Sequence, residues 1–168
     1  MDDKNRPLNV AFASTSHGDA ETLVQMRIDA MRESLERIGR YDPQRARNRF
    51  LSSFDPACCR FIVANGVSVG FVVAKTTGDH LALEHLYIVP AYQGRGIGSA
   101  VLASVFADAD ARSIPVKVGA LRDSDSNRFY QRHGFVKIDE SEWDIYYLRE
   151  SRTKPGDNGR IKQQGLQP

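Results

Sequence analysis

The stretch that decides the fold is Gln93–Gly98, QGRGIG, in which glycines alternate with other residues. The apolar run HLALEHLYIV at 80–89 precedes it, and the helical pattern SAVLASVFADADA at 99–111 follows it. Glycine is costly inside a helix or strand because it loses the most backbone freedom on folding. Three glycines at a strand-to-helix corner therefore indicate a backbone that must stay bare, either for close packing or for a ligand.

A corner of this kind is a potential anion site. The first N–H groups of a helix have no partner within the helix, and the helix dipole adds partial positive charge. The side chains of Gln93 and Arg95 can add further donors. A Walker P-loop needs GxxxxGK[ST], and a dinucleotide fingerprint needs GxGxxG near the start of a βαβ unit. The spacing here is GxGxG after four expected strands, so both nucleotide-binding patterns fit poorly.

On the N-terminal side, the pattern predicts one strand and two helices. Residues 8–14 alternate as a strand does. An apolar stripe at intervals of three and four predicts a helix of about 19 residues that ends at Gly39. Asp42 as N-cap and Pro43 in the first turn then begin a second helix, which runs to about Phe54.

An antiparallel meander is expected next. Asn65-Gly66 separates the apolar runs 59–64 and 68–76, and Asn-Gly is the strongest short hairpin signal. Gly78-Asp79 forms the turn to a further strand at 80–89. Three consecutive strands with short turns pair antiparallel.

After the glycine corner, the sequence predicts a crossover helix, a strand, a short helix and a final hairpin, at 96–113, 116–121, 124–133, 135–141 and 143–150. A strand that follows a crossover helix is parallel to the strand before it. The whole order predicts one α+β domain over 1–150, in three α/β layers. Its sheet is mixed and mostly antiparallel, with about six to seven strands and about four flanking helices. Residues 151–168 are expected to be a disordered tail.

Composition excludes several function classes. The net charge of +2 gives no reason to expect nucleic acid or a membrane surface as partner. No apolar run approaches the roughly 20 residues that cross a bilayer, and the polar N-terminus is no signal peptide, so a cytoplasmic location is expected. The adjacent Cys58 and Cys59 are interpreted as reduced thiols. No HxxxH or HExxH pattern occurs, so no metal site is predicted.

Two blocks carry a family resemblance. The segment LEHLYIVPAYQGRGIGSAVL at 83–102 resembles the acyl-CoA site of the GNAT superfamily of N-acyltransferases, and Gln93, Gly96 and Gly98 match its [QR]-x-x-G-x-[GA] signature. NRFYQRHGF at 127–135 resembles the family's next block. The resemblance spans about 8–149 and implies a GNAT-like fold, in which the fourth and fifth strands splay apart.

The resemblance also implies the cosubstrate and its site. Acetyl-CoA would place its diphosphate on the main chain of Gln93, Gly94, Arg95, Gly96, Ile97, Gly98 and Ser99. Its pantetheine arm would follow the end of the fourth strand, where the N–H of Ile88 or Val89 would stabilise the oxyanion. Asn127 would bond or orient the cosubstrate. Tyr130, close to the sulfur, is the expected general acid.

The general base is predicted from the fourth strand. Glu84 lies where the family often carries a glutamate, in an apolar run where a carboxylate is expensive. Strand alternation puts Glu84 on the face of Leu86 and Ile88, and His85 on the opposite face. A β-bulge would shift this assignment by one residue. Glu84 is the preferred base, with His85 or a water-mediated route as the alternatives.

The expected activity is direct transfer of an acetyl group from acetyl-CoA to a primary amine through a tetrahedral intermediate. A small-molecule amine is the first choice of acceptor, and a protein lysine or N-terminal amine is the second. The alternative is a non-catalytic acyl-CoA-binding sensor. Arg37 and Arg40 of the interhelical loop are interpreted either as surface charge or as residues that bind a carboxylate of the acceptor. Trp143 and Tyr146 of the last hairpin either border the acceptor or pack on the sheet. The resemblance allows a homodimer.

Overall fold

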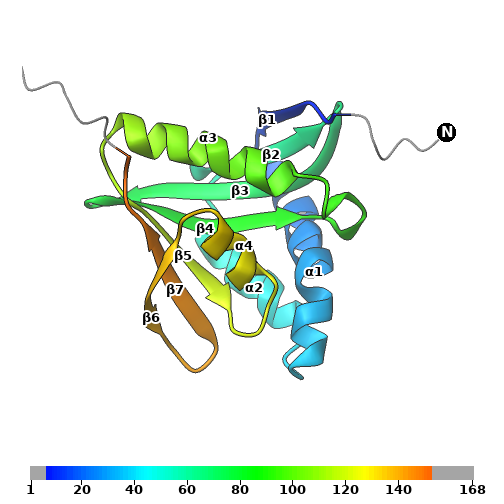
Figure 1. Ribbon diagram of the computed structural model, residues 1–168. Coiled ribbons are helices and arrows are strands. Elements are labelled where there is room, and N and C mark those ends of the chain that lie inside the picture. The colour runs from blue at the N-terminus through cyan, green and yellow to red at the C-terminus, as the bar shows by residue number, and fades with distance from the viewer. Residues whose placement is uncertain (1–6, 153–168) are drawn as a thin grey trace, which may run out of the picture.

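The computed structural model of the protein describes residues 7–152, and Figure 1 shows its arrangement. The helices and strands follow the expected order: β1 Val10–Ser14, α1 Ala20–Arg37, α2 Pro43–Ser53, β2 Cys59–Ala64, β3 Val67–Thr77, β4 His80–Ile88, α3 Ile97–Ala111, β5 Val116–Leu121, α4 Ser126–Arg132, β6 Val136–Glu140 and β7 Asp144–Arg149. Apart from its first two residues, the tail expected at 151–168 lies outside the described residues.

The strands form one seven-stranded sheet in the order β1-β2-β3-β4-β5-β7-β6. Every neighbouring pair is antiparallel except β4 and β5, which run parallel. That parallel pairing covers only Leu81–Leu83 against Val116–Val118. Figure 1 shows β4 and β5 diverging beyond it. The predicted mixed sheet with a splayed parallel pair is thereby confirmed.

Helices cover both faces of the sheet. Neighbouring side chains of a strand point to opposite faces, and Val72 and Val73 of β3 accordingly join two different core clusters. The Val72 cluster contains the apolar stripe of α3, whereas the Val73 cluster contains residues of α1 and α2. The three layers are therefore α3, the sheet, and the α1–α2 pair.

Local signals act where the sequence predicted them. Asn65 and Gly66 both have positive φ, 49° and 83°, as a two-residue hairpin turn with the sheet's twist requires. The Asp42 carboxylate accepts a hydrogen bond from the Arg45 N–H at 3.0 Å and caps α2. Cys58 and Cys59 are free thiols, at the end of the 3₁₀ turn η3 (Pro56–Cys58) and at the start of β2, and burial raises the pKa of Cys59 to about 11.

Two kinds of feature are missing from the part of the chain that the structure describes. None of its helices is both long and apolar enough to cross a bilayer. None of its His, Cys, Asp and Glu side chains gather in threes around a common metal position.

Candidate active site

The glycine corner combines two requirements. Gly94 and Gly96 have φ of +70° and +79°, in the left-handed region that favours glycine, and a Cβ at either would meet nothing within 4 Å. Gly98 differs, because a Cβ there would stand 3.0 Å from the Phe129 ring of α4. Two glycines therefore shape an open corner, and the third allows α3 and α4 to pack closely.

This corner exposes a row of N–H groups. Within residues 7–152, the N–H groups of 94–99 have no acceptor, and the first main-chain bond of α3 runs from Ala100 N–H to Gly96 O. The Arg95 guanidinium lies over the Tyr92 ring, 5.3 Å from its centroid, beside these groups. A cation next to unpartnered N–H groups at a helix start is a site for an anion.

Gln93 acts differently from the other corner residues. Its N–H bonds to Pro90 O at 3.2 Å, within the short 3₁₀ turn η4 (Pro90–Tyr92), so this donor is already occupied. Its side-chain amide donates to Ile88 O at 2.8 Å. Gln93 therefore links the glycine corner to the end of β4. Since its N–H is occupied, the main-chain N–H groups expected to bind the diphosphate are those of residues 94–99.

At the end of β4, the pairing with β3 distinguishes the two N–H groups that are expected to stabilise the oxyanion. The Val89 N–H bonds to Val69 O of β3 at 2.9 Å and is therefore occupied. Bonds in an antiparallel ladder alternate in direction along the strand, so the N–H of Ile88 points away from β3. On that side β4 has no ladder pair beyond Leu83. Ile88, and not Val89, offers a free donor to the splay.

A β-bulge lies at Glu84. Val73 of β3 pairs with His85 and Ala74 pairs with Leu83, which leaves Glu84 as the extra residue. The alternation assumed from sequence therefore fails here, in the way that a bulge was expected to change it. The Glu84 side chain is 38% exposed, and its carboxylate lies 3.2 Å from the Lys75 ammonium. The bulge thus gives a carboxylate water access at the point where β4 and β5 part.

His85 packs among aromatic rings. Its ring centroid lies 5.5 Å from that of Phe50 and 5.6 Å from that of Tyr87. Burial, followed by the nearby Arg27 charge, lowers the pKa of His85 to about 4. Its Nδ1 is shielded from solvent and has no partner among the described residues. His85 is therefore a neutral imidazole near pH 7.

Tyr130 is 6% exposed and lies against the Phe135 and Tyr147 rings. Burial, with a smaller contribution from Tyr87, raises the pKa of the Tyr130 hydroxyl far above its ordinary range. The hydroxyl therefore stays protonated and can act as a hydrogen-bond donor. Tyr130 lines the same cleft as Glu84, so the fold brings the expected acid and the expected base to one site.

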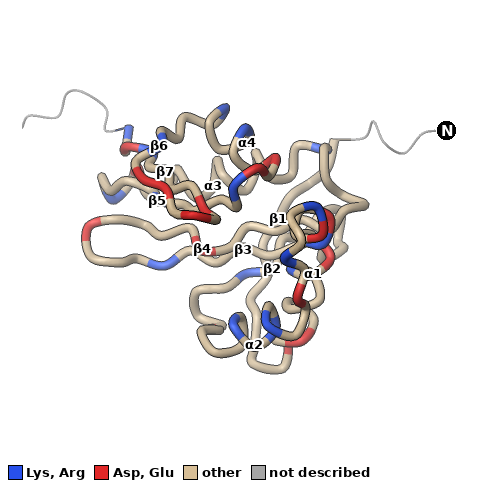
Figure 2. The backbone as a smooth tube through the Cα atoms, turned by 90° about the horizontal axis from the view of Figure 1, so that it is seen from below, with Lys and Arg blue, Asp and Glu red and all other residues tan. Residues whose placement is uncertain are grey.

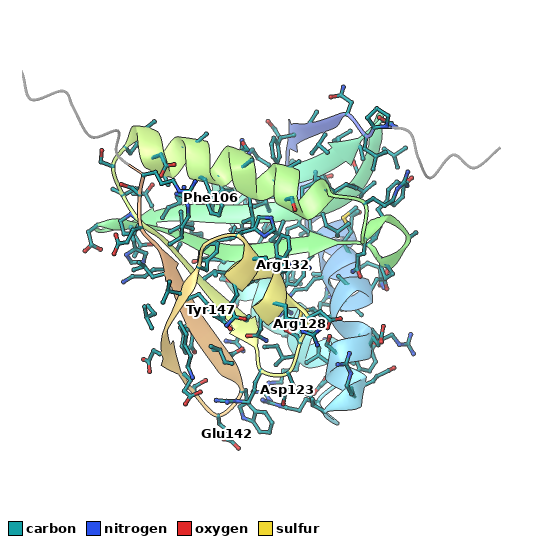
Figure 3. All side chains as sticks on the ribbon, viewed as in Figure 1. Phe106, Asp123, Arg128, Arg132, Glu142 and Tyr147 are labelled. Carbon is teal, nitrogen blue, oxygen red and sulfur yellow. The ribbon has the colours of Figure 1, made fainter. Side chains whose placement is uncertain are left out.

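Asn127 serves the protein's own structure. Its amide nitrogen donates to Leu121 O and Ser124 O, both at 2.9 Å, and its oxygen accepts from the Tyr147 hydroxyl at 2.8 Å. Figure 3 shows Tyr147 reaching from β7 toward α4. Asn127 thus fixes the turn between β5 and α4. Its contact with the cosubstrate stays a prediction.

The cleft has a volume of about 1190 Å³ and lies between the α1–α2 pair, the splay and the final hairpin. Trp143 and Tyr146 line it, as expected, and so does Arg40. The Arg40 guanidinium lies 4.0 Å from the Trp143 ring centroid, so the interhelical loop contacts the hairpin across the cleft. Arg37 lies outside the lining, and its guanidinium donates to Asp123 O at 3.4 Å.

The structure adds lining residues that the sequence reasoning missed: Arg27, Arg45, Arg49, Lys75 and Tyr87. Helical spacing could have indicated two of them, because residues four apart on α2 share a face. Lys75 could not be predicted from spacing, since the β-bulge determines that Glu84 lies beside it.

Comparisons with known proteins agree with this geometry. Residues 57–137 match the family described as Acetyltransferase (GNAT) domain. The chain is 29% identical over 79 residues to the [ribosomal protein bS18]-alanine N-acetyltransferase of Haemophilus influenzae. That alignment covers 46% of this chain and 54% of the relative, so the match spans about half of the relative's length.

Solved structures share the fold over most of the chain. The PaiA N-acetyltransferase of Thermoplasma acidophilum, in complex with coenzyme A, superposes with a TM-score of 0.66 at 18% identity, over 84% of this chain and 99% of that one. The ribosomal-protein-S18-alanine N-acetyltransferase of Escherichia coli gives 0.62 at 16% identity, over 89% and 98%. At these identities the likeness concerns the fold alone. The match of residues 57–137 to a GNAT acetyltransferase domain, together with a fold shared with solved N-acetyltransferases, agrees with the resemblance carried by the two sequence blocks.

Proposed function

We propose that the protein is an acetyl-CoA-dependent N-acetyltransferase that acetylates a primary amine. One observation carries the proposal: the unpartnered N–H groups of 94–99 lie at one end of a splay that opens into a cleft holding Glu84 and Tyr130. A diphosphate fits the first feature, and a thioester beside a polar cleft fits the second. The coenzyme A complex of the Thermoplasma protein supports this choice of cosubstrate.

The residues divide the chemistry between them. Glu84 takes a proton from the acceptor ammonium through water, and the free amine attacks the thioester carbonyl. The Ile88 N–H bonds the oxyanion that forms, and such a donor contributes about 3 kcal/mol to transition-state stability. The nitrogen of the tetrahedral intermediate loses its second proton to solvent, and the intermediate breaks its C–S bond to give the neutral amide and a thiolate. The Tyr130 hydroxyl donates a hydrogen bond to that sulfur.

The raised pKa of Tyr130 decides how it acts. A free thiol has a pKa of about 8.5, so full proton transfer from a buried tyrosine to the thiolate is uphill. Hydrogen bonding from the hydroxyl to the developing charge still favours C–S cleavage. Solvent can protonate the thiolate after it leaves.

Glu84 is the better base for two reasons. Its carboxylate is exposed to water on the bulge, whereas His85 is enclosed by rings. A histidine with a pKa of about 4 also binds a proton weakly near pH 7. Glu84→Gln is therefore expected to lower kcat strongly at neutral pH, whereas His85→Phe retains most of it.

The acceptor is a primary amine, for which a small molecule remains our first choice. The Arg40–Trp143 contact bridges the cleft and favours a compact acceptor over a chain that passes through it. A protein N-terminal amine is the second candidate, since the Haemophilus relative is named for acetylating an alanine of a ribosomal protein. A homodimer and a cytoplasmic location stay predictions.

Two measurements test the proposal. Calorimetry with coenzyme A should show binding that ATP and NAD do not match. Incubation with acetyl-CoA and a panel of amines should release the free thiol, which a thiol reagent detects. Heat with coenzyme A but no thiol release from any small amine or N-terminal peptide would favour a sensor, and no heat from a folded protein would overturn the proposal.

A further inference from the structure

One wall of the cleft is rich in arginine. Arg27 of α1, with Arg45 and Arg49 of α2, lines the cleft, and we call these three residues the arginine wall. Arg45 and Arg49 are four residues apart and therefore project from the same face of α2. Figure 2 shows the basic positions on this helix.

The arginine wall lacks the ion pairs that occupy other arginines nearby. Arg47, on the same helix, is paired with Glu21. Within residues 7–152, neither Arg45 nor Arg49 has a carboxylate partner. Arg27 donates one bond from Nη1 to Ala46 O at 3.0 Å, and its shielded Nε has no partner among the described residues. The three guanidinium groups thus form no ion pair among the described residues, although the Asp42 carboxylate lies nearby and accepts from the Arg45 main-chain N–H.

Four carboxylates line the cleft, and one of them, Asp42, lies at the start of α2. Asp139 of β6 and Asp144 of β7 line the hairpin wall, and Glu84 lies on β4 with Lys75 as its partner. The pKa of His85, on the floor, is lowered by burial and then by Arg27, Lys75 and Arg49, so the field of these cations reaches the floor. The cleft therefore presents both charges, with three arginines on the α1–α2 side and two carboxylates on the hairpin side, which suits an acceptor that carries both charges.

We propose that the acceptor is a small primary amine bearing a carboxylate or phosphate, and that this anion binds the arginine wall while the amine reaches Glu84. Guanidinium groups bind both anions through paired, charge-assisted hydrogen bonds. The same charges disfavour a polyamine, which has no anionic group. This inference rests on the proposed acetyltransferase function and names the acceptor class of that site.

Binding can be measured apart from catalysis, because Trp143 is the single tryptophan of the chain and lines the cleft. Protein loaded with coenzyme A is titrated with β-alanine and O-phosphoethanolamine, and with their counterparts that lack the anionic group, β-alaninamide and ethanolamine, while Trp143 fluorescence is followed. We expect saturable binding of at least one anionic amine and weaker binding of its counterpart. The two anionic arms separate a carboxylate from a phosphate acceptor.

Variants locate the anion. Arg45→Gln/Arg49→Gln should weaken binding of the amine that bears the anion by at least about tenfold and raise its KM similarly. Binding of the counterparts that lack the anionic group should not change. Arg47→Gln is the matched control on the same helix and should change neither. This inference would be overturned by equal binding of amines with and without the anionic group. No binding of any amine to the coenzyme-loaded protein, or acetylation of peptides alone, would overturn it as well. The proposed function fails separately, if coenzyme A itself does not bind.

Discussion

Glu84 and His85 are neighbours in the chain, yet they meet different surroundings. The bulge leaves Glu84 partly in water beside Lys75, while His85 lies between aromatic rings. The two candidate bases therefore differ in what each can do with a proton. Each can be tested by a single substitution that keeps the packing.

Tyr130→Phe removes only the hydroxyl and keeps the ring contacts with Phe129 and Phe135. We expect kcat to fall by about 10- to 100-fold, because a hydrogen bond to a charged group contributes about 1.5–3 kcal/mol. The affinity for coenzyme A should stay nearly the same, because the diphosphate site is elsewhere. Steady-state kinetics and calorimetry check the two quantities. A loss confined to affinity would show that Tyr130 does not assist the leaving group.

The lowered pKa of His85 predicts acid sensitivity of the fold. Above about pH 6.5 the imidazole is neutral in both states, and the free energy of unfolding is unaffected. Between that pH and about 4, the imidazole of the unfolded chain is protonated before that of the folded protein. The free energy of unfolding therefore decreases as the pH is lowered. The total loss is on the order of 3 kcal/mol.

His85→Phe should remove this component and leave acid titration of the carboxyl groups unchanged. Urea unfolding of the protein and the variant at several pH values between 4 and 7 measures the difference. Parallel curves for the two proteins would contradict the assignment of a neutral, buried His85.

Single-residue motifs indicated the site but not the partners of its members. Gln93 and Gly96 were placed correctly at the corner, because the motif ties them to a helix start. The side-chain bonds of Gln93 to Ile88 O and of Asn127 to Leu121 O lie within local turns, whose shape the motifs do not specify. The motif match does not show which way a side chain in such a turn points, so the sequence assigned both side chains to the ligand, and these ligand contacts stay predictions.

At the scale of elements, β3 and β4 approach closely where the expected oxyanion donor lies. Gly70 pairs with Ile88, and a Cβ on Gly70 would stand 2.0 Å from Tyr87 O. Real Cβ atoms do not come so near a carbonyl oxygen, so the strands would have to separate. This glycine sets the position of the β4 end and of its free N–H.

Gly70→Ala is therefore expected to cost about 3 kcal/mol of folding free energy and to lower kcat as well, because the Ile88 N–H moves. Gly119→Ala is the matched control, since its Cβ would meet only the Tyr146 ring, at 3.3 Å, and that side chain can turn aside. Urea unfolding and acetylation rates measure both variants. Equal effects of the two substitutions would contradict the role given to Gly70.

Element types and order were predictable because each element carries its own boundary signals, such as Asp42 and Asn65-Gly66. The bulge at Glu84 was foreseen only as a possibility. Its position follows from how β3 and β4 fit together, since neither strand has a glycine or proline at that point. Strand alternation alone therefore misplaced the two candidate bases relative to each other.

At the scale of the whole molecule, the splay divides the sheet into β1–β4 and β5–β7, which share three residue pairs. A second tie lies at the other end of α3. Arg149 of β7 is 6% exposed and bonds the Asp110 carboxylate at 2.7 and 3.0 Å, with its guanidinium 4.0 Å from the Phe106 ring centroid. Figure 3 shows Phe106 on the sheet side of α3. With these contacts at one end, β4 and β5 are held together least where they diverge, which we call the mouth of the splay.

Acetyl-CoA should bridge that mouth and leave a signature in amide hydrogen exchange. The Ile88 N–H points into the splay without a ladder partner, so it should exchange quickly in the free protein and become protected when the pantetheine arm binds. The Val89 N–H already bonds to Val69 O and should exchange slowly in both states. Amide exchange measured by NMR with and without coenzyme A compares the two neighbours directly. Protection of Val89 alone on binding, or of neither while calorimetry shows full occupancy, would mean that the cosubstrate does not follow β4.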